Sequence, residues 1–432
     1  MTATQNLPAA SATPPQGVSK PKGAANPATP ADTDQDLDYR ASTITPLQGV
    51  ALIFGTNIGA GILSLPYAGR NGGFLALVLA LLIAGTLTTI SMFYVAEVSL
   101  RTKRPLQLSG LAEHYLGNWG RWAVFIAIMV NGIGALIAYA AGSGELIHNL
   151  TGAPEIVGTL IFFAIGTAIM YKGLEATGVT EMLITAGMAT IILILCGWTF
   201  IGPGIEMANV VVLHPYFIIP IMNLAVFTFM AQYVVPEMVR GLEQDHSAQI
   251  SKAIIAGMVI TGFTLSLVPF AALGLMGEKV SEVVTLSWGE ELGPAAYYLA
   301  NVFALLAMFT SFMAIGYTTM RNILDMAHWP QHGWQRGLAV ALTAVPPLII
   351  CFAGMGGFVS ALSYAGGLAG VVMSIVPVML LRASRARGDR EPAWQVGWSA
   401  HPLIQWTIIA VYGLAGLYSV GTILGLVPAG WQ

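Results

Sequence analysis

The sequence predicts an all-α polytopic membrane protein with two inverted five-helix repeats and an eleventh helix. Of its 432 residues, 56% are hydrophobic and only 9% are charged, whereas an ordinary soluble domain carries roughly 25% charged residues. Apolar runs of about 20 residues, the length that crosses roughly 30 Å of hydrocarbon, recur eleven times along the chain. The first and the sixth runs contain residues that interrupt a helix, and their spacing predicts the repeats.

Each apolar run is expected to form one transmembrane helix. The runs fall near residues 46–69, 74–100, 120–148, 154–171, 180–201, 217–240, 251–275, 292–320, 337–355, 358–381 and 403–428. The chain is predicted to comprise a disordered cytoplasmic tail (1–42), a first repeat (43–201), a second repeat (202–382), and a loop with the eleventh helix (383–432). The tail is rich in Ala, Thr and Pro and holds few large apolar side chains, which is typical of disorder.

The distribution of basic residues predicts the orientation. With the N-terminus inside, all 18 Lys and Arg residues except Arg70 and Lys279 fall on the cytoplasmic side of eleven helices. Cytoplasmic loops of membrane proteins carry an excess of Lys and Arg. The charge pattern therefore predicts that the C-terminus lies outside.

The stretch Gly55–Pro66, Gly-Thr-Asn-Ile-Gly-Ala-Gly-Ile-Leu-Ser-Leu-Pro, interrupts the first predicted helix. Glycine costs about 1 kcal/mol in a helix interior, and three glycines precede the proline here. Non-helical backbone at membrane depth is tolerated only where it is buried in protein or lines a cavity. We therefore expect this stretch to line a cavity.

A second interruption is predicted between Phe229 and Pro236 in the sixth run. Proline has no backbone N–H, so the carbonyl of Gln232 is expected to lose its helical partner. Two breaks five helices apart place the two halves in opposite membrane orientations, which is the pattern of inverted repeats.

The first break is predicted to bind a zwitterion. The half-helix that begins near Ala60 and Gly61 points its positive dipole end at the gap, which suits a carboxylate. Freed carbonyls are expected to accept hydrogen bonds from an ammonium group, and they lie near Thr56, Asn57, Phe229 and Met230. The alternative interpretation is a glycine-lined helix crossing without a ligand.

A cation site is predicted beside the first break. Ala307, Thr310 and Ser311 share one helix face because they stand at positions i, i+3 and i+4. Two hydroxyls, the Ala307 carbonyl and the carbonyls of Gly55 and Ile58 supply five oxygen ligands for a monovalent cation. The alternative is an ordinary helix–helix contact through Thr310 and Ser311.

Soluble-enzyme signals are missing from the sequence. It contains no Gly-rich phosphate loop, no His-Glu-x-x-His and no cluster of His and Cys residues, so we expect no enzyme and no nucleic-acid partner.

Tyr139 is predicted to cap the zwitterion site, with a structural tyrosine of the core as the alternative. The expected partners are a small amino acid and the lipid bilayer, and the oligomeric state stays open.

The Gly55–Pro66 stretch strongly resembles the first helix of the aromatic and hydroxy amino acid permease group and the amino acid/auxin permeases. Both belong to the amino acid-polyamine-organocation superfamily. Val235-Pro236-Glu237, Thr310-Ser311-Phe312 and the eleven-helix layout are similar to the same group. The resemblance covers about residues 43–430 and implies the leucine-transporter-type fold.

By this resemblance, the amides near Ala60 and Gly61 bind the substrate carboxylate. It also implies an oxygen-only sodium site that joins the first and eighth helices, with the ligands Gly55, Ile58, Ala307, Thr310 and Ser311.

The chain departs from the family pattern at several positions. Ile62 stands where sodium-coupled neurotransmitter-type relatives place an Asn of a second sodium site. Gln232 replaces a frequent His and follows Met230 and Ala231 instead of a glycine-rich stretch, so the substrate's side chain stays undefined. Some proton-coupled relatives place a Lys in the fifth helix, and residues 180–201 contain none.

The expected function is import of a neutral amino acid by alternating access, coupled to one sodium ion, in the plasma (inner) membrane. The residues expected to contact the substrate are Thr56, Asn57, Ala60, Gly61, Ile62, Tyr139, Phe229, Met230, Ala231 and Gln232. One alternative is a proton-coupled symporter of the same fold without a bound metal ion. The other is a transport-inactive amino acid sensor.

Overall fold

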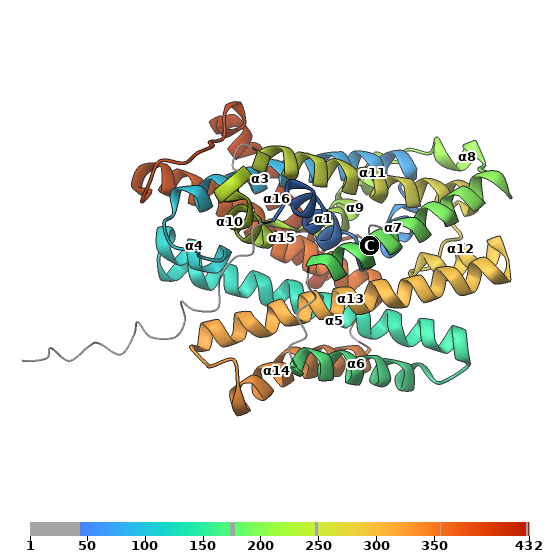
Figure 1. Ribbon diagram of the computed structural model, residues 1–432. Coiled ribbons are helices and arrows are strands. Elements are labelled where there is room, and N and C mark those ends of the chain that lie inside the picture. Colours follow the sequence, from blue (N-terminus) through green and yellow to red (C-terminus); the bar gives the residue numbers. More distant parts are fainter. Residues whose placement is uncertain (1–43, 173–177, 247–248, 355, 429–430, 432) are drawn as a thin grey trace, which may run out of the picture. The chain divides into compact units, whose positions relative to one another are not determined.

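A computed structural model describes residues 44–172, 178–246, 249–354, 356–428 and 431. Residues 41–432 form one compact unit, which contains helices and no strand wherever it is described (Figure 1). The predicted tail, residues 1–42, lies outside the described residues. The all-α prediction is confirmed for the part of the chain that the structure describes.

The helices follow one another with short connections. In chain order they are α1 (Pro46–Asn57), α2 (Ala60–Gly69), α3 (Phe74–Arg101), α4 (Leu108–Leu116), α5 (Asn118–Thr151), α6 (Glu155–Lys172), α7 (Gly178–Ile201), α8 (Met207–Val210), η1 (Pro215–Phe217), α9 (Ile218–Thr228), η2 (Gln232–Val234), α10 (Val235–His246), α11 (Ile250–Met276), α12 (Val284–Leu292), α13 (Pro294–Ala327), α14 (Gly333–Phe352), α15 (Phe358–Arg387), η4 (Trp398–Ala400) and α16 (Pro402–Ile423).

Nine helices among the described residues are long and apolar enough to cross a membrane, or ten if the bent pair α1 and α2 counts as one span. The described apolar part of α7, Ala186–Ile201, is shorter. The count of eleven spans therefore stays a prediction. Helix α15 continues past residue 382, the predicted end of the second repeat, to Arg387.

The predicted break in the first span is confirmed. Helices α1 and α2 are bent by 53° relative to each other, and only Ile58 and Gly59 lie between them. Thr45 and Gln48 form a capping box at the start of α1, which satisfies two main-chain N–H groups. Pro66 lies inside α2 and does not end it.

The predicted break in the sixth span is also confirmed, but its geometry differs from the prediction. Residues 229–231 are non-helical, and α10 begins at Val235. Pro236 is thus the second residue of a new helix, where a missing N–H has no consequence. The Gln232 carbonyl accepts the N–H of Val235, so the prediction that Pro236 frees this carbonyl is wrong.

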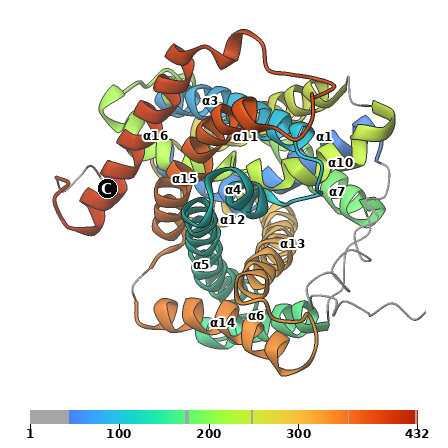
Figure 2. The same cartoon turned by 90° about the vertical axis from the view of Figure 1, so that its left-hand side faces the viewer.

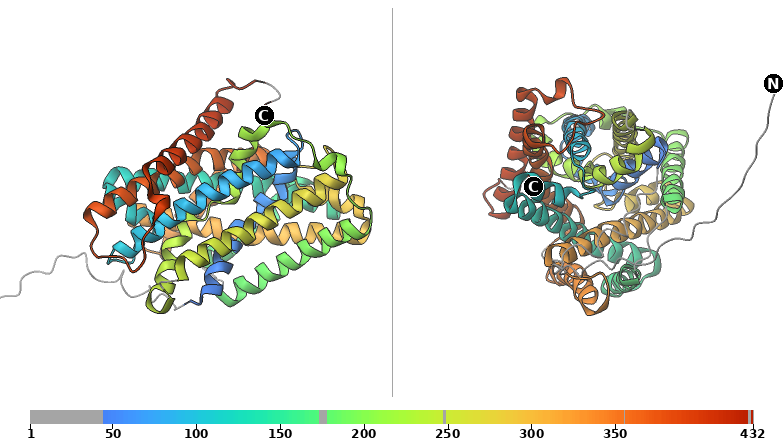
Figure 3. Two further views of the ribbon diagram at one scale, coloured as in Figure 1. Left: turned by 90° about the horizontal axis from the view of Figure 1, so that it is seen from above. Right: turned by 60° about the vertical axis from the view of Figure 1, so that its left-hand side comes forward.

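Helices α5 and α15 form the centre of the bundle. Helix α15 packs against α3, α5, α9 and α16, and α5 also packs against α13 and α6. Figure 2 shows α6 and α14 side by side at the edge of the bundle beyond α5 and α13. Figure 3 shows α16 at another edge, where Leu414 and Leu417 are exposed. Exposed apolar side chains on outer helices are expected where lipid surrounds the bundle.

A buried carboxylate ties the loop after α15 to the end of α3. Glu97 is fully buried, and its Oε1 accepts hydrogen bonds from Arg101 Nε at 2.9 Å and Arg385 Nε at 2.8 Å. Its Oε2 accepts from Arg385 Nη2 at 2.8 Å and the Val396 N–H at 2.7 Å. Four hydrogen bonds, most of them charge-assisted, therefore converge on one side chain.

Other basic side chains lie at the same end of the bundle as Arg101 and Arg385. Arg387 donates to the Tyr115 carbonyl, and Arg240 donates to the Pro105 carbonyl. Asp389 lies in the loop after α15 and accepts a hydrogen bond from the N–H of Lys103, which follows α3. This bond holds the pKa of the Asp389 carboxyl below its usual value. These basic residues gather at one end of the bundle, as the sequence predicts. The placement of this end in the cytoplasm stays a prediction.

Replacing Glu97 is expected to destabilise the protein. Glu97→Ala leaves two guanidinium groups close together without their shared carboxylate, and we expect the free energy of unfolding to fall by about 3 kcal/mol. Denaturant unfolding of purified protein in detergent measures this. Glu391→Ala is the control, because that side chain is 95% exposed and lies 3.8 Å from Arg101. Equal stability of the two variants would contradict the role given to Glu97.

Candidate functional site

The first break leaves main-chain acceptors unused. The Phe54 carbonyl accepts the Ile58 N–H at 2.9 Å. Within the described parts of the chain, no main-chain N–H donates to the four carbonyls that follow it, which belong to Gly55, Thr56, Asn57 and Ile58. These are the orphan acceptors that the end of any helix presents.

The same break leaves main-chain donors unused. The Ile62 N–H donates to the Gly59 carbonyl at 3.2 Å, but the N–H groups of Ala60 and Gly61 have no main-chain acceptor among the described residues. They stand at the positive end of the α2 dipole. Main-chain acceptors and main-chain donors that lack a main-chain partner therefore meet at one interruption of the backbone.

Two glycines let neighbouring helices approach this break closely. A Cβ atom added at Gly59 would collide with Ser311 Oγ of α13, and one added at Gly61 would collide with Thr228 Cγ2 of α9. Gly55 and Gly61 both lie inside helices. Close packing thus explains Gly59 and Gly61 better than unwinding alone does.

A cavity opens at the break between α1, α2, α5, α13 and the second break. It encloses about 330 Å³ of space without atoms, part of it open to the outside. The lining residues are Thr56, Asn57, Gly59, Ala60, Gly61, Asn131, Tyr139, Phe227, Met230, Tyr233, Ser311 and Ile315. None of them is an acid, a Lys, an Arg or a His.

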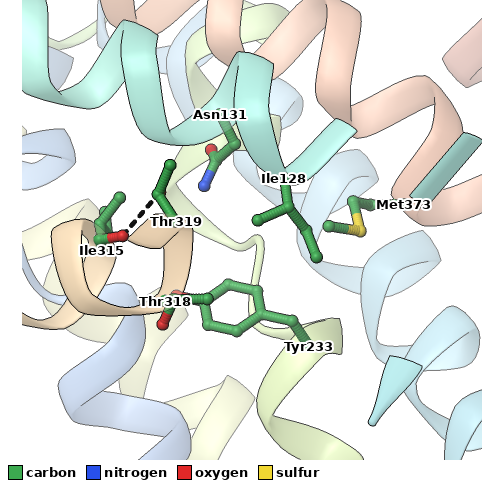
Figure 4. A pocket seen from close by; sticks show the side chains of 7 residues that line it. All are labelled: Ile128, Asn131, Tyr233, Ile315, Thr318, Thr319 and Met373. Carbon is green, nitrogen blue, oxygen red and sulfur yellow. Dashed lines mark hydrogen bonds between the residues drawn. The ribbon is translucent and has the colours of Figure 1, made fainter. Parts of the chain in front are cut away.

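A second cavity of about 240 Å³ adjoins the first (Figure 4). The two cavities share Asn131, Tyr233 and Ile315. The second is completed by Ile128 of α5, Thr318 and Thr319 of α13, and Met373 of α15. We call these the break cavity and the side cavity.

Six of the ten residues expected to contact the substrate line the break cavity: Thr56, Asn57, Ala60, Gly61, Tyr139 and Met230. Tyr139 is fully buried and faces Ser311 and Tyr233. The main-chain groups of Thr56, Asn57, Ala60 and Gly61 are those that the zwitterion hypothesis requires.

The other four, Ile62, Phe229, Ala231 and Gln232, are buried but do not line this cavity. The Phe229 ring packs against Gly85 of α3 and Gly262 of α11. Its carbonyl already accepts the Ala231 N–H at 2.9 Å, contrary to the expectation of a free group. Gln232 Nε2 donates to Ser374 Oγ of α15 at 3.4 Å.

The sequence analysis did not single out four of the lining residues, namely Asn131, Phe227, Tyr233 and Ile315. Asn131 offered a usable signal, because it is an amide in the middle of an apolar run. The other three lie on faces that only the tertiary packing defines.

Three of the five residues of the predicted cation site lie at or against the first break: Gly55 and Ile58 belong to the chain segment that breaks, and Ser311 lies against Gly59. Ser311 lines the break cavity beside Gly59, and Thr310 Oγ1 donates to the Ala307 carbonyl at 3.1 Å. A hydroxyl that donates one hydrogen bond keeps lone pairs for a cation. The oxygen-only cation site stays a prediction.

Residues 43–417 match the sequence profile of the tryptophan/tyrosine permease family. The chain belongs to this family. The tyrosine-specific transport system 1 of Haemophilus influenzae is 26% identical over 78% of this chain and 88% of its own length. The tryptophan-specific transport protein of the same organism is 25% identical over 79% and 88%. Glutamine transporter 2 of Aliivibrio fischeri is 21% identical over 80% and 91%.

Among solved structures, the chain is similar to the manganese transporter of Eremococcus coleocola, crystallised with an aromatic bis-isothiourea substituted compound. The TM-score is 0.61 at 15% identity, over 89% of this chain and 88% of that one. At this identity the likeness concerns the fold alone. Membership of the permease family makes the protein a multi-pass integral membrane protein and a permease, not an enzyme.

The close approach of Gly61 and Thr228 predicts a suppressible defect. Gly61→Ala is expected to lower the free energy of unfolding by about 1–3 kcal/mol through overpacking, and Thr228→Ala in the same chain is expected to restore most of it. Chemical denaturation in detergent measures both. Gly413→Ala is the control, since nothing lies within 4 Å of its added Cβ. A double variant as unstable as Gly61→Ala would show that the contact is irrelevant.

Proposed function

We propose that the protein imports a neutral amino acid by alternating access and couples this to one sodium ion. One observation carries the proposal. A broken helix presents unpartnered main-chain donors and acceptors to a cavity whose lining side chains carry no charge. Such a site suits a ligand with one positive and one negative group and no further charge.

The substrate carboxylate binds the N–H groups of Ala60 and Gly61, where the α2 dipole adds to its stabilisation. The ammonium group donates to the orphan carbonyls of Thr56 and Asn57. Tyr139 covers the site from α5. The named substrates of the relatives, tyrosine, tryptophan and glutamine, are all neutral amino acids, which supports this assignment.

The sodium ion binds the carbonyls of Gly55, Ile58 and Ala307 and the hydroxyls of Thr310 and Ser311. Oxygen ligands suit a hard cation. An ion held by both segments links the first break to α13, where Gly59 and Ser311 already touch. Sodium that binds the outward-facing state more tightly shifts the population toward it and favours substrate binding there.

We propose alternating access because we interpret the fold as two inverted five-helix repeats of the leucine-transporter type. The two observed breaks, at residues 58–59 and 229–231, lie in the first and sixth predicted spans, and α2 packs against α9. In such folds the substrate lies between the broken helices, and the repeats move around it.

Removing the two hydroxyls tests the ion site. Thr310→Ala combined with Ser311→Ala is expected to abolish sodium-dependent uptake into proteoliposomes while the protein still folds. Thr343→Ala is the matched control, because that buried hydroxyl also donates to a main-chain carbonyl, Ala339, but lies on α14. Sodium-dependent uptake that survives in the double variant would rule out this site.

The decisive experiment for the whole proposal is uptake of labelled amino acids into proteoliposomes, with sodium and pH gradients imposed separately. Uptake driven by sodium at constant pH supports the proposal, and uptake driven only by the pH gradient replaces sodium with a proton. Counterflow of labelled amino acid identifies a transporter, because a sensor binds its ligand without exchanging it.

A further inference from the structure

We infer that α16 positions the second break, and with it one wall of the break cavity, through Tyr412 and Ser419. The inference rests on the proposed function, because it concerns how the proposed substrate site is held in shape. The sequence analysis assigns this helix to neither five-helix repeat, and none of its residues lines the break cavity or the side cavity. Tyr412 and Ser419 are therefore positioning residues, which act through other side chains.

Helix α16 carries two buried hydroxyls on its inner face. The helix lies at an edge of the bundle (Figure 3), and Leu414 and Leu417 on its outer side are exposed, whereas Tyr412 and Ser419 are fully buried. These two residues stand seven positions apart, so they share one face and lie about 10 Å apart along the helix axis. Buried hydroxyls at membrane depth need partners, and both find them toward the sixth span.

Ser419 holds the sixth span before the second break. Asn223 Nδ2 of α9 donates to Ser419 Oγ at 2.6 Å, and both side chains are buried. A Cβ atom added at Gly367 of α15 would collide with Ser419 Oγ and with Asn223 Nδ2. The hydrogen bond therefore joins α16 to α9 across α15 at a position where only glycine leaves room.

Tyr412 holds the sixth span after the break through an intermediate residue. Gln232 Nε2 of η2 donates to Ser374 Oγ of α15 at 3.4 Å, and Ser374 forms a side-chain hydrogen bond with the Tyr412 hydroxyl. The Thr88 hydroxyl of α3 lies 2.5 Å from the same Tyr412 oxygen. All four side chains are buried. The Tyr412 hydroxyl thus connects Gln232 to α3, α15 and α16.

The two contacts bracket the second break. Asn223 precedes the non-helical residues 229–231, and Gln232 follows them directly. Phe227 and Met230, which line the break cavity, lie between these two held residues. Because both ends of the break are bonded to one helix, the angle between them is fixed. The positions of Phe227 and Met230 in the cavity wall are fixed with it.

Releasing either contact lets the break adopt further arrangements. Only those that shape the cavity for the substrate bind it, so the apparent dissociation constant rises as their population falls. Loss of one hydrogen bond shifts such an equilibrium by about fivefold. A general loss of stability acts differently, because it reduces the number of active molecules and lowers the maximal rate without changing KM. A change in KM therefore distinguishes positioning from a merely structural role.

The test measures uptake kinetics in proteoliposomes and equilibrium binding to purified protein in detergent. The probe is the labelled neutral amino acid that the parent imports best from a panel that includes tyrosine, tryptophan and glutamine. Ser419→Ala and Tyr412→Phe are each expected to raise KM and the dissociation constant by about threefold to tenfold. Asn223→Ala added to Ser419→Ala is expected to raise them no further, since both changes remove the same hydrogen bond.

Each variant has a matched control. Thr407→Ala is the control for Ser419→Ala, because the Thr407 hydroxyl donates to the Leu403 carbonyl within α16 itself. Tyr94→Phe is the control for Tyr412→Phe, because Tyr94 of α3 is also fully buried but its hydroxyl donates to the Ser399 carbonyl. Both controls should keep the parent's KM.

The outcomes separate this inference from the proposed function. An unchanged KM in Ser419→Ala and Tyr412→Phe, with only the maximal rate lowered, would overturn the inference and leave transport intact. A KM that rises as much in the controls, or additive effects of the Asn223 and Ser419 changes, would also overturn it. A parent that imports no amino acid of the panel would overturn the proposed function itself.

Discussion

The structure depends on one constraint, namely that every main-chain polar group at membrane depth needs a partner. The first span violates this at Ile58 and Gly59, where acceptors of residues 55–58 and donors of residues 60–61 have no main-chain partner. The surrounding elements enclose this interruption: α9 packs against α2, and Ser311 of α13 lies against Gly59. Because neighbouring helices pack around the break, a ligand or water in the cavity is needed to complete its hydrogen bonds.

Small residues make this enclosure possible. Gly61 allows Thr228 to approach α2, Gly132 allows Thr319 to approach α5, and Gly366 of α15 lies against the Asn223 carbonyl of α9. In lipid, helices associate through close packing and not through the hydrophobic effect. The glycines are therefore distributed along the helices that surround the cavities and are not confined to the break, which is why a single glycine-rich motif describes only part of the site.

The sequence could predict those features of the fold and the site that depend on local backbone chemistry. Gly55–Pro66 predicted the first break, and its main-chain groups are orphaned as expected, because the ends of helices have the same needs in every fold. Pro236 predicted the second break, although it begins the new helix instead of bending the old one. Phe229 and Ile62 were assigned to the cavity and Tyr233 was not, because the direction of a side chain near a break depends on how the backbone turns there.

The distribution of charge explains how an uncharged site handles a charged ligand. Glu97 pairs with Arg101 and Arg385 at the basic end of the bundle, whereas the residues that line both cavities include no acid, Lys, Arg or His. In this apolar surrounding an isolated charge is strongly disfavoured, and main-chain dipoles compensate it only partly. The two charges of a zwitterion have opposite signs and sum to zero. An acidic or basic side chain adds a third charge, which no residue lining the side cavity balances. A site with this lining disfavours charged amino acids without any repulsive residue, which is the physical basis of the proposal that the substrate is neutral.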